Sequence, residues 1–151
     1  MKLFFVYLKT VRMYNYNNLL LLDDDADDRA FFKEALSCVA PGVHCHMASN
    51  GREGLSLLSF MSPDIIVADI NMPVMNGRVF LQELHTWTTH PPVIMMSTCS
   101  NELSEMRKMG AAHFFQKPIT FKALCTIVQT IFEHAWTIAQ LAGDRKVAPS
   151  L

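Results

Sequence analysis

Short, continuous apolar runs alternate along this chain with longer segments in which apolar residues recur every three or four positions. A continuous apolar run that ends in a charged or polar residue is typical of a strand buried on both faces of a parallel sheet. The clear runs cover residues 19–22, 65–68, 93–96 and 114–115, and a weaker one covers residues 43–48.

The segments between and after these runs have the spacing of amphipathic helices. In the first of them, Phe32, Leu36 and Val39 fall on one apolar stripe. Five strands that alternate with five helices predict an α/β fold, with a parallel sheet covered by helices on both faces. The helices are expected over residues 30–39, 55–61, 79–85, 102–109 and 121–141.

Composition narrows the class of protein. The chain has 151 residues, of which 50% are apolar and 18% are charged, and its formal net charge is −1. These values fit one domain with a sizeable core, and they argue against disorder and against binding nucleic acid through a basic field. Four scattered cysteines favour reduced thiols in a cytoplasmic protein, and no segment approaches the ~18 apolar residues of a membrane span.

Three parts are expected along the chain. Residues 1–18 form an N-terminal extension whose apolar run is too short for a signal peptide. The pattern favours Met13 as the natural start, with the preceding residues a start-site artefact. Residues 19–142 are expected to form the domain, and residues 143–151 a polar tail with no output domain after it.

Functional groups follow the apolar runs. Asp23 and Asp24 follow the first run, Asp69 follows the third, Ser97 the fourth and Lys117 the fifth. Ligands of an open parallel sheet bind outside the carboxyl ends of its strands, so these side chains are expected to gather at one edge.

Three carboxylates at one edge repel each other unless cations lie among them. Mg²⁺ prefers oxygen ligands and takes one or two protein carboxylates, which suits Asp23 and Asp24. Asp69 is then free to act as a nucleophile, since carboxylates form aspartyl phosphates. Lys117 would neutralise phosphoryl charge, and the Ser97 hydroxyl could donate to a phosphoryl oxygen.

The segments 19–25, 63–77, 92–98 and 117–119 resemble those of bacterial response-regulator receiver domains, of the chemotaxis-regulator-like, stand-alone type. They contain an acidic pair, a D-x-x-M-P-x-M-x-G block, a Ser-Thr pair and a Lys-Pro pair, in the order of that family. The resemblance implies a flavodoxin-like, doubly wound sheet of five strands in the order 2-1-3-4-5.

The same resemblance implies the roles of the acidic residues. Asp69 is the phosphoacceptor. Asp23, Asp24 and Asp69 hold Mg²⁺, and Asn71 contributes its backbone carbonyl. Asp25, Asp27 and Asp28 are interpreted instead as a helix cap and surface residues.

Other roles follow from the resemblance as well. Ser97 and Phe114 are the switch residues, and Lys117 contacts the phosphoryl group. The peptide bond between Lys117 and Pro118 is expected to be cis, and Gly77 is expected to be structural.

The implied partner is a histidine kinase or a phosphotransfer protein, with an unknown protein downstream. The chain is expected to be a phosphoacceptor with at most slow autodephosphorylation rather than an enzyme, and a monomer or weak dimer without nucleic-acid or membrane partners. Two departures from the family bear on access and output. Thr98 stands where Ala or Gly is usual, and the stretch from Ser97 to Lys117 is about two residues short, which predicts a short fourth helix.

Alternatives remain open from the residues alone. Asp23, Asp25 and Asp27 partly fit the nucleophile motif of a haloacid-dehalogenase-type phosphatase, and a degenerate receiver would bind partners without phosphorylation. The same three aspartates with Glu34 match four positions of a calcium loop that lacks its glycine. His44 and His46 could share a metal, although partly exposed histidines are the simpler interpretation.

Overall fold

Five parallel strands form one sheet in the computed structural model, which describes residues 15–134 and Trp136. The strand order is β2-β1-β3-β4-β5, so the predicted α/β fold and its order are confirmed. The predicted polar tail and most of the predicted N-terminal extension lie outside the described residues. The strands are β1 (Asn18–Leu22), β2 (His44–Ala48), β3 (Ile65–Asp69), β4 (Val93–Ser97) and β5 (His113–Gln116).

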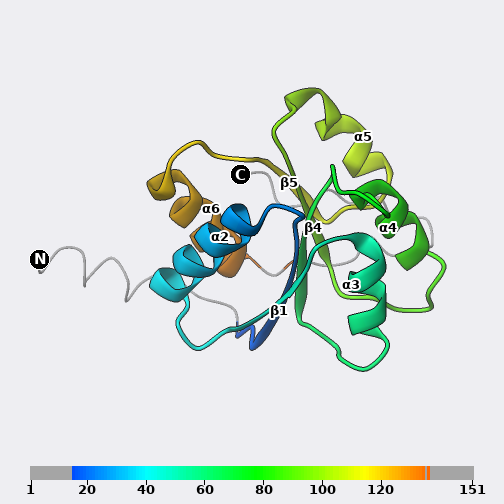
Figure 1. Ribbon diagram of the computed structural model, residues 1–151, viewed down its shortest axis with the longest axis horizontal. Coiled ribbons are helices and arrows are strands. Elements are labelled where there is room, and N and C mark those ends of the chain that lie inside the picture. Colours follow the sequence, from blue (N-terminus) through cyan, green and yellow to red (C-terminus); the bar gives the residue numbers. More distant parts are fainter. Residues whose placement is uncertain (1–14, 135, 137–151) are drawn as a thin grey trace, which may run out of the picture.

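Helices cover both faces of the sheet, as Figure 1 shows: α2 and α6 lie on one side, and α3, α4 and α5 on the other. A short 3₁₀ turn, η1 (Ser100–Glu102), leads into α5. None of the described helices is long and apolar enough to cross a membrane. The helices are α2 (Ala26–Val39), α3 (Gly51–Leu58), α4 (Gly77–Leu84), α5 (Leu103–Lys108) and α6 (Phe121–Glu133).

The sheet has a separate apolar cluster on each face, which explains the continuous apolar runs of its central strands. In β1, Leu20 and Leu22 belong to the cluster under α3 and α4, whereas Leu19 and Leu21 belong to the cluster under α2 and α6. Successive side chains of a strand point to opposite faces, so a strand covered on both faces buries all of them.

Side-chain caps begin α2, α3, α4 and α6. The Asp25 carboxylate accepts hydrogen bonds from the backbone N–H groups of Asp27 and Asp28, and it thereby begins α2. The interpretation of Asp25 as a cap is confirmed. Asn50, Asn76 and Thr120 cap α3, α4 and α6 in the same way.

The lengths of the last two helices, α5 and α6, can be compared with the predicted ones. Helix α5 has only six residues, which confirms the short fourth helix. The last helix was expected to reach Leu141, and this expectation is wrong because His134 has an extended backbone (φ −115°, ψ 139°). Beyond it, Trp136 is buried and donates its indole N–H to the carbonyl of Ile131.

Candidate functional site

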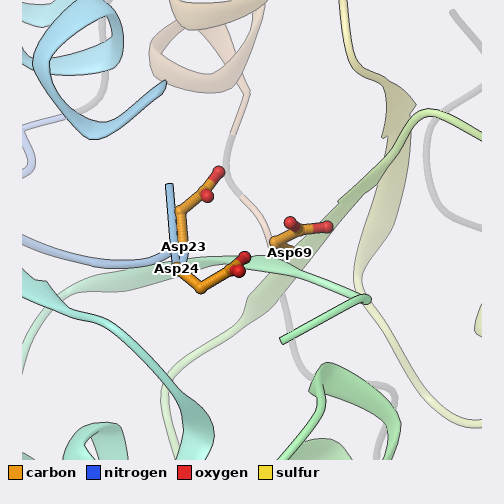
Figure 2. A group of neighbouring side chains, drawn as sticks. All are labelled: Asp23, Asp24 and Asp69. Carbon is orange, nitrogen blue, oxygen red and sulfur yellow. The ribbon is translucent and has the colours of Figure 1, made fainter. Parts of the chain in front are cut away.

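The carboxylates of Asp23, Asp24 and Asp69 meet at the carboxyl edge of the sheet. Strands β1 and β3 are neighbours with Leu22 paired to Ala68, so the residues that follow these positions come together. One oxygen from each carboxylate lies within 4.8 Å of the others, and Figure 2 shows the three side chains side by side. The sequence placed these three residues at one edge, and the structure brings them into one cluster.

Asp69 is the last residue of β3 and is only 7% exposed. Its Oδ1 accepts the backbone N–H of Asn71 at 3.2 Å. Gly77 begins α4 directly behind it and donates its N–H to the carbonyl of Ile70. A Cβ atom at Gly77 would lie 2.3 Å from the carbonyl oxygen of Asp69, so any other residue would push this end of β3 aside.

Lys117 is the cation of the site. Its ammonium donates to Oδ2 of Asp23 at 2.8 Å and to Oδ2 of Asp69 at 3.0 Å. A third hydrogen bond, of 2.9 Å, goes to Oδ2 of Asp28. The interpretation of Asp28 as a surface residue was therefore incomplete. A signal was present, because Asp28 belongs to the first turn of the helix that begins just after the acidic pair Asp23 and Asp24.

Burial and the shared ammonium set the charge states. Burial raises the pKa values of Asp23 and Asp69 above the usual range, because one ammonium shared by several carboxylates does not offset the loss of solvation. For Lys117 burial acts to lower the pKa, but the hydrogen bonds to Asp23, Asp28 and Asp69 outweigh it and raise the pKa above its usual value. The site therefore holds an excess of negative charge that favours a further cation.

Ser97 and Phe114, the two predicted switch residues, are both buried. The Ser97 hydroxyl is fully buried and donates to Oε2 of Glu102, not to Asp69. Phe114 is 3% exposed and packs in the apolar cluster under α4 and α5. Sequence reasoning missed Glu102, which precedes α5 and lies five residues beyond Ser97.

A cavity of about 330 Å³ opens beside the site. Its polar wall includes Asp28, Asp69 and Lys117, and Thr98 also lines it. Thr98 therefore borders the approach to Asp69, whereas Ser97 is not among the lining residues. The rest of the wall is mostly apolar and includes Phe31, Phe32, Val67, Met96, Phe121 and Leu124.

The expected cis bond between Lys117 and Pro118 is not present, since all described peptide bonds are trans. Both isomers are accessible at an X–Pro bond, and trans is favoured by about 0.5–1 kcal/mol. In the trans form the next residue, Ile119, is fully exposed beside the cavity.

Neither alternative metal site forms a group of three or more ligands among the residues that the structure describes. Among the residues that the structure describes, Asp23, Asp24 and Asp69 are the one group of three or more side chains able to hold a metal. The carboxylate of Asp25, which the calcium loop would use as a ligand, instead caps α2. His46 instead pairs with the amide oxygen of Asn18 at 3.3 Å, and His44 is exposed.

Comparison with known proteins agrees with this geometry. The sequence model of the response regulator receiver domain matches residues 19–129. The chain is 33% identical over 115 residues to the regulatory protein AtoC of Escherichia coli (strain K12), a match that covers 75% of this chain and 24% of AtoC. It is 32% identical over 120 residues to a protein-glutamate methylesterase/protein-glutamine glutaminase of Treponema denticola, covering 75% of this chain and 32% of that protein.

Among solved structures, the chemotaxis response regulator CheY4 of Vibrio cholerae superposes with a TM-score of 0.67 at 26% identity. That match covers 78% of this chain and 99% of CheY4. The chain therefore belongs to the response regulator receiver domain family, which acts in two-component signal transduction. It spans about a quarter to a third of the length of these two curated relatives.

Proposed function

We propose that this chain is phosphorylated on Asp69 by a histidine kinase or a histidine phosphotransfer protein, in a reaction that uses Mg²⁺. The observation that carries the proposal is the position of the Asp69 carboxylate. It borders an open cavity, 3.0 Å from the ammonium of Lys117 and next to the carboxylates of Asp23 and Asp24. A carboxylate nucleophile, a fixed cation and a cation-binding pair are the groups that phosphoryl transfer to aspartate requires.

The proposed transfer forms one bond and breaks one. An Oδ atom of Asp69 attacks the phosphorus of a phosphohistidine, the P–N bond breaks, and the imidazole leaves as the neutral ring once it holds a proton from solvent. The hydrogen bond from Lys117 opposes the effect of burial on the pKa of Asp69, and the ammonium then compensates the charge of the incoming phosphoryl oxygens. Thr98 and the apolar wall of the cavity border the approach of the donor.

The residues of the site fit Mg²⁺. Asp23, Asp24 and Asp69 offer hard carboxylate oxygens in one cluster, and their charge exceeds what Lys117 compensates. In the proposal these three side chains hold the ion with the backbone carbonyl of Asn71. When bound, Mg²⁺ supplies positive charge that stabilises the phosphoryl oxygens.

The proposed output follows from the same assignment. Phosphorylation adds charge at the carboxyl edge of the sheet, and Ser97 and Phe114 are the residues proposed to respond to it. The signal passes through protein contacts or by onward phosphotransfer, in the cytoplasm, from a monomer or weak dimer. The receiver domain is a phosphoacceptor in this proposal, not the catalyst of a downstream reaction.

Intact-mass analysis after incubation with a small acyl phosphate and Mg²⁺ tests the proposal. The wild type is expected to gain one phosphoryl group, and Asp69→Asn is expected to gain none. Asp27→Asn is the matched control, because Asp27 is an exposed aspartate of the same edge whose side chain makes no hydrogen bond to Lys117. A folded wild type that stays unlabelled with Mg²⁺ present would contradict the proposal and favour a phosphorylation-independent binding module. Multiple turnover of a phosphoester would instead favour a phosphatase.

A further inference from the structure

The hydroxyl of Ser97 is already engaged with partners other than Asp69. It donates to Oε2 of Glu102 at 2.5 Å and accepts the backbone N–H of Cys99 at 3.1 Å. Ser97 ends β4, and it lies one residue beyond Met96, which is paired with Asp69. The hydroxyl therefore sits next to the phosphoacceptor in the sheet while its proton points to the start of α5.

Glu102 is held in place from a third element. Its second oxygen, Oε1, accepts from the guanidinium of Arg78 at 2.9 Å, and Arg78 lies in the first turn of α4. The guanidinium also pairs with Glu105 at 2.5 Å, on the exposed side of α5. Both oxygens of Glu102 are thus occupied, and its side chain is only 18% exposed.

A serine hydroxyl has one proton to donate. Ser97 can give it to Glu102 or to an oxygen on the side of Asp69, but not to both at once. A hydrogen bond to a carboxylate is stronger than one between neutral groups. Breaking the hydrogen bond from Ser97 to Glu102 therefore costs free energy.

We infer that Glu102 is a positioning residue of the phosphoacceptor site: it holds the Ser97 hydroxyl away from Asp69 until a phosphoryl group competes for the proton. This inference rests on the proposed phosphorylation of Asp69. Glu102 touches neither Asp69 nor Lys117, and it acts only through Ser97.

A consequence appears at α5. When Ser97 leaves, Glu102 keeps Arg78 as its partner but loses its tie to β4. The turn η1 and the short α5 are then connected to the sheet edge by one contact fewer. Phosphorylation would thereby loosen the segment that begins at Ser100. A change at the buried site would in this way alter the surface formed by η1 and α5.

Removing Glu102 tests the inference by a double-mutant cycle on the rate of labelling by an acyl phosphate with Mg²⁺. Glu102→Ala is expected to speed labelling about tenfold, because Ser97 no longer leaves a charged acceptor. In the Ser97→Ala background the same change is expected to have no effect. Equal effects of Glu102→Ala with and without the Ser97 hydroxyl would overturn the inference.

Two further variants separate positioning from simple destabilisation. Glu102→Gln keeps an oxygen acceptor without the charge, so its rate is expected to fall between those of the wild type and Glu102→Ala. Glu105→Ala removes the other carboxylate partner of Arg78 but leaves Ser97 and Glu102 in contact, so it is expected to label like the wild type. An acceleration in Glu105→Ala as large as in Glu102→Ala would contradict the inference.

The unphosphorylated protein gives an independent measurement. The Cys99 N–H donates to the Ser97 oxygen, so its hydrogen exchange reports whether that oxygen stays in place. Exchange at Cys99 is expected to rise in Glu102→Ala and to stay unchanged in Glu105→Ala; unchanged exchange in Glu102→Ala would overturn the inference. If the variants show this exchange pattern but the wild type is never labelled at Asp69, the proposed function is overturned instead.

Discussion

The ammonium of Lys117 lies 2.9 Å from Oδ2 of Asp28, a residue of the first turn of α2 that is 89 positions away in the sequence. This contact joins the loop after β5 to α2, and both residues line the cavity. It also adds a fourth carboxylate to the site, which already holds those of Asp23, Asp24 and Asp69. Lys117 is consequently shared among more carboxylates than the sequence alone indicated.

Asp28→Asn is expected to speed labelling of Asp69 by a small anionic acyl phosphate. The side chain is 47% exposed, so its charge is well screened. Removing one charge a few ångströms from the incoming anion changes the energy by about 0.5–1 kcal/mol at a water-like dielectric, or about two- to fivefold in rate. Initial rates at low ionic strength measure the effect, which should shrink at high salt. Asp27→Asn is the matched control, and equal acceleration in both variants would show a general charge effect.

Mg²⁺ is expected to raise the stability of the protein through Asp23, Asp24 and Asp69. At a concentration ten times its dissociation constant, an ion that binds only the folded state adds about 1.4 kcal/mol to the free energy of unfolding. Urea unfolding with Mg²⁺ and with a chelator measures this gain. Asp24→Asn should reduce it, while Asp27→Asn should keep it. A gain that survives Asp24→Asn unchanged would argue that the ion binds elsewhere.

Gly77→Ala is expected to destabilise the domain and to impair labelling at Asp69. The new Cβ would lie 2.3 Å from the Asp69 carbonyl oxygen and 2.9 Å from the Cα of Ile70, and both are backbone atoms that cannot move alone. Overpacking of this kind costs about 1–3 kcal/mol. Gly42→Ala is the control, because nothing lies within 4 Å of its added Cβ. Denaturant unfolding of both variants measures the difference, and similar stabilities would show that β3 and α4 can separate without cost.

His113 is expected to make the protein less stable in mild acid. The ring is 6% exposed, and its Nδ1 has no hydrogen-bond partner in the part of the chain that the structure describes. Burial, with smaller contributions from Arg107 and His134, lowers the pKa of His113. The unfolded chain then binds a proton near pH 6.5 while the folded protein does not, so stability falls as the pH drops below about 6.5.

Unfolding of His113→Phe between pH 7.5 and 5.5 measures this contribution, because phenylalanine keeps the ring contacts with Phe115 and Trp136 without titrating. The wild type should lose up to about 1 kcal/mol more per pH unit than the variant. His44→Gln, at an exposed strand position, is the control. Parallel curves for the wild type and His113→Phe would contradict the assignment.

Much of the site could be predicted from the sequence because of how parallel sheets are built. An apolar run marks a strand buried on both faces, and the residue after it must lie at the carboxyl edge. Asp23, Asp24, Asp69 and Lys117 were found in this way and do meet. The short α5 was also predictable, since the number of residues between Ser97 and Lys117 limits its length.

Hydrogen-bond partners and backbone isomers were decided only by the tertiary structure. The apolar pattern fixes which edge a side chain reaches, but not which of several nearby groups it contacts there. Asp28 meets Lys117 because α2 packs over that edge, and Ser97 meets Glu102 because the turn η1 folds back on β4. The trans bond at Pro118 and the end of α6 at Glu133 likewise depend on small energy differences that distant packing decides.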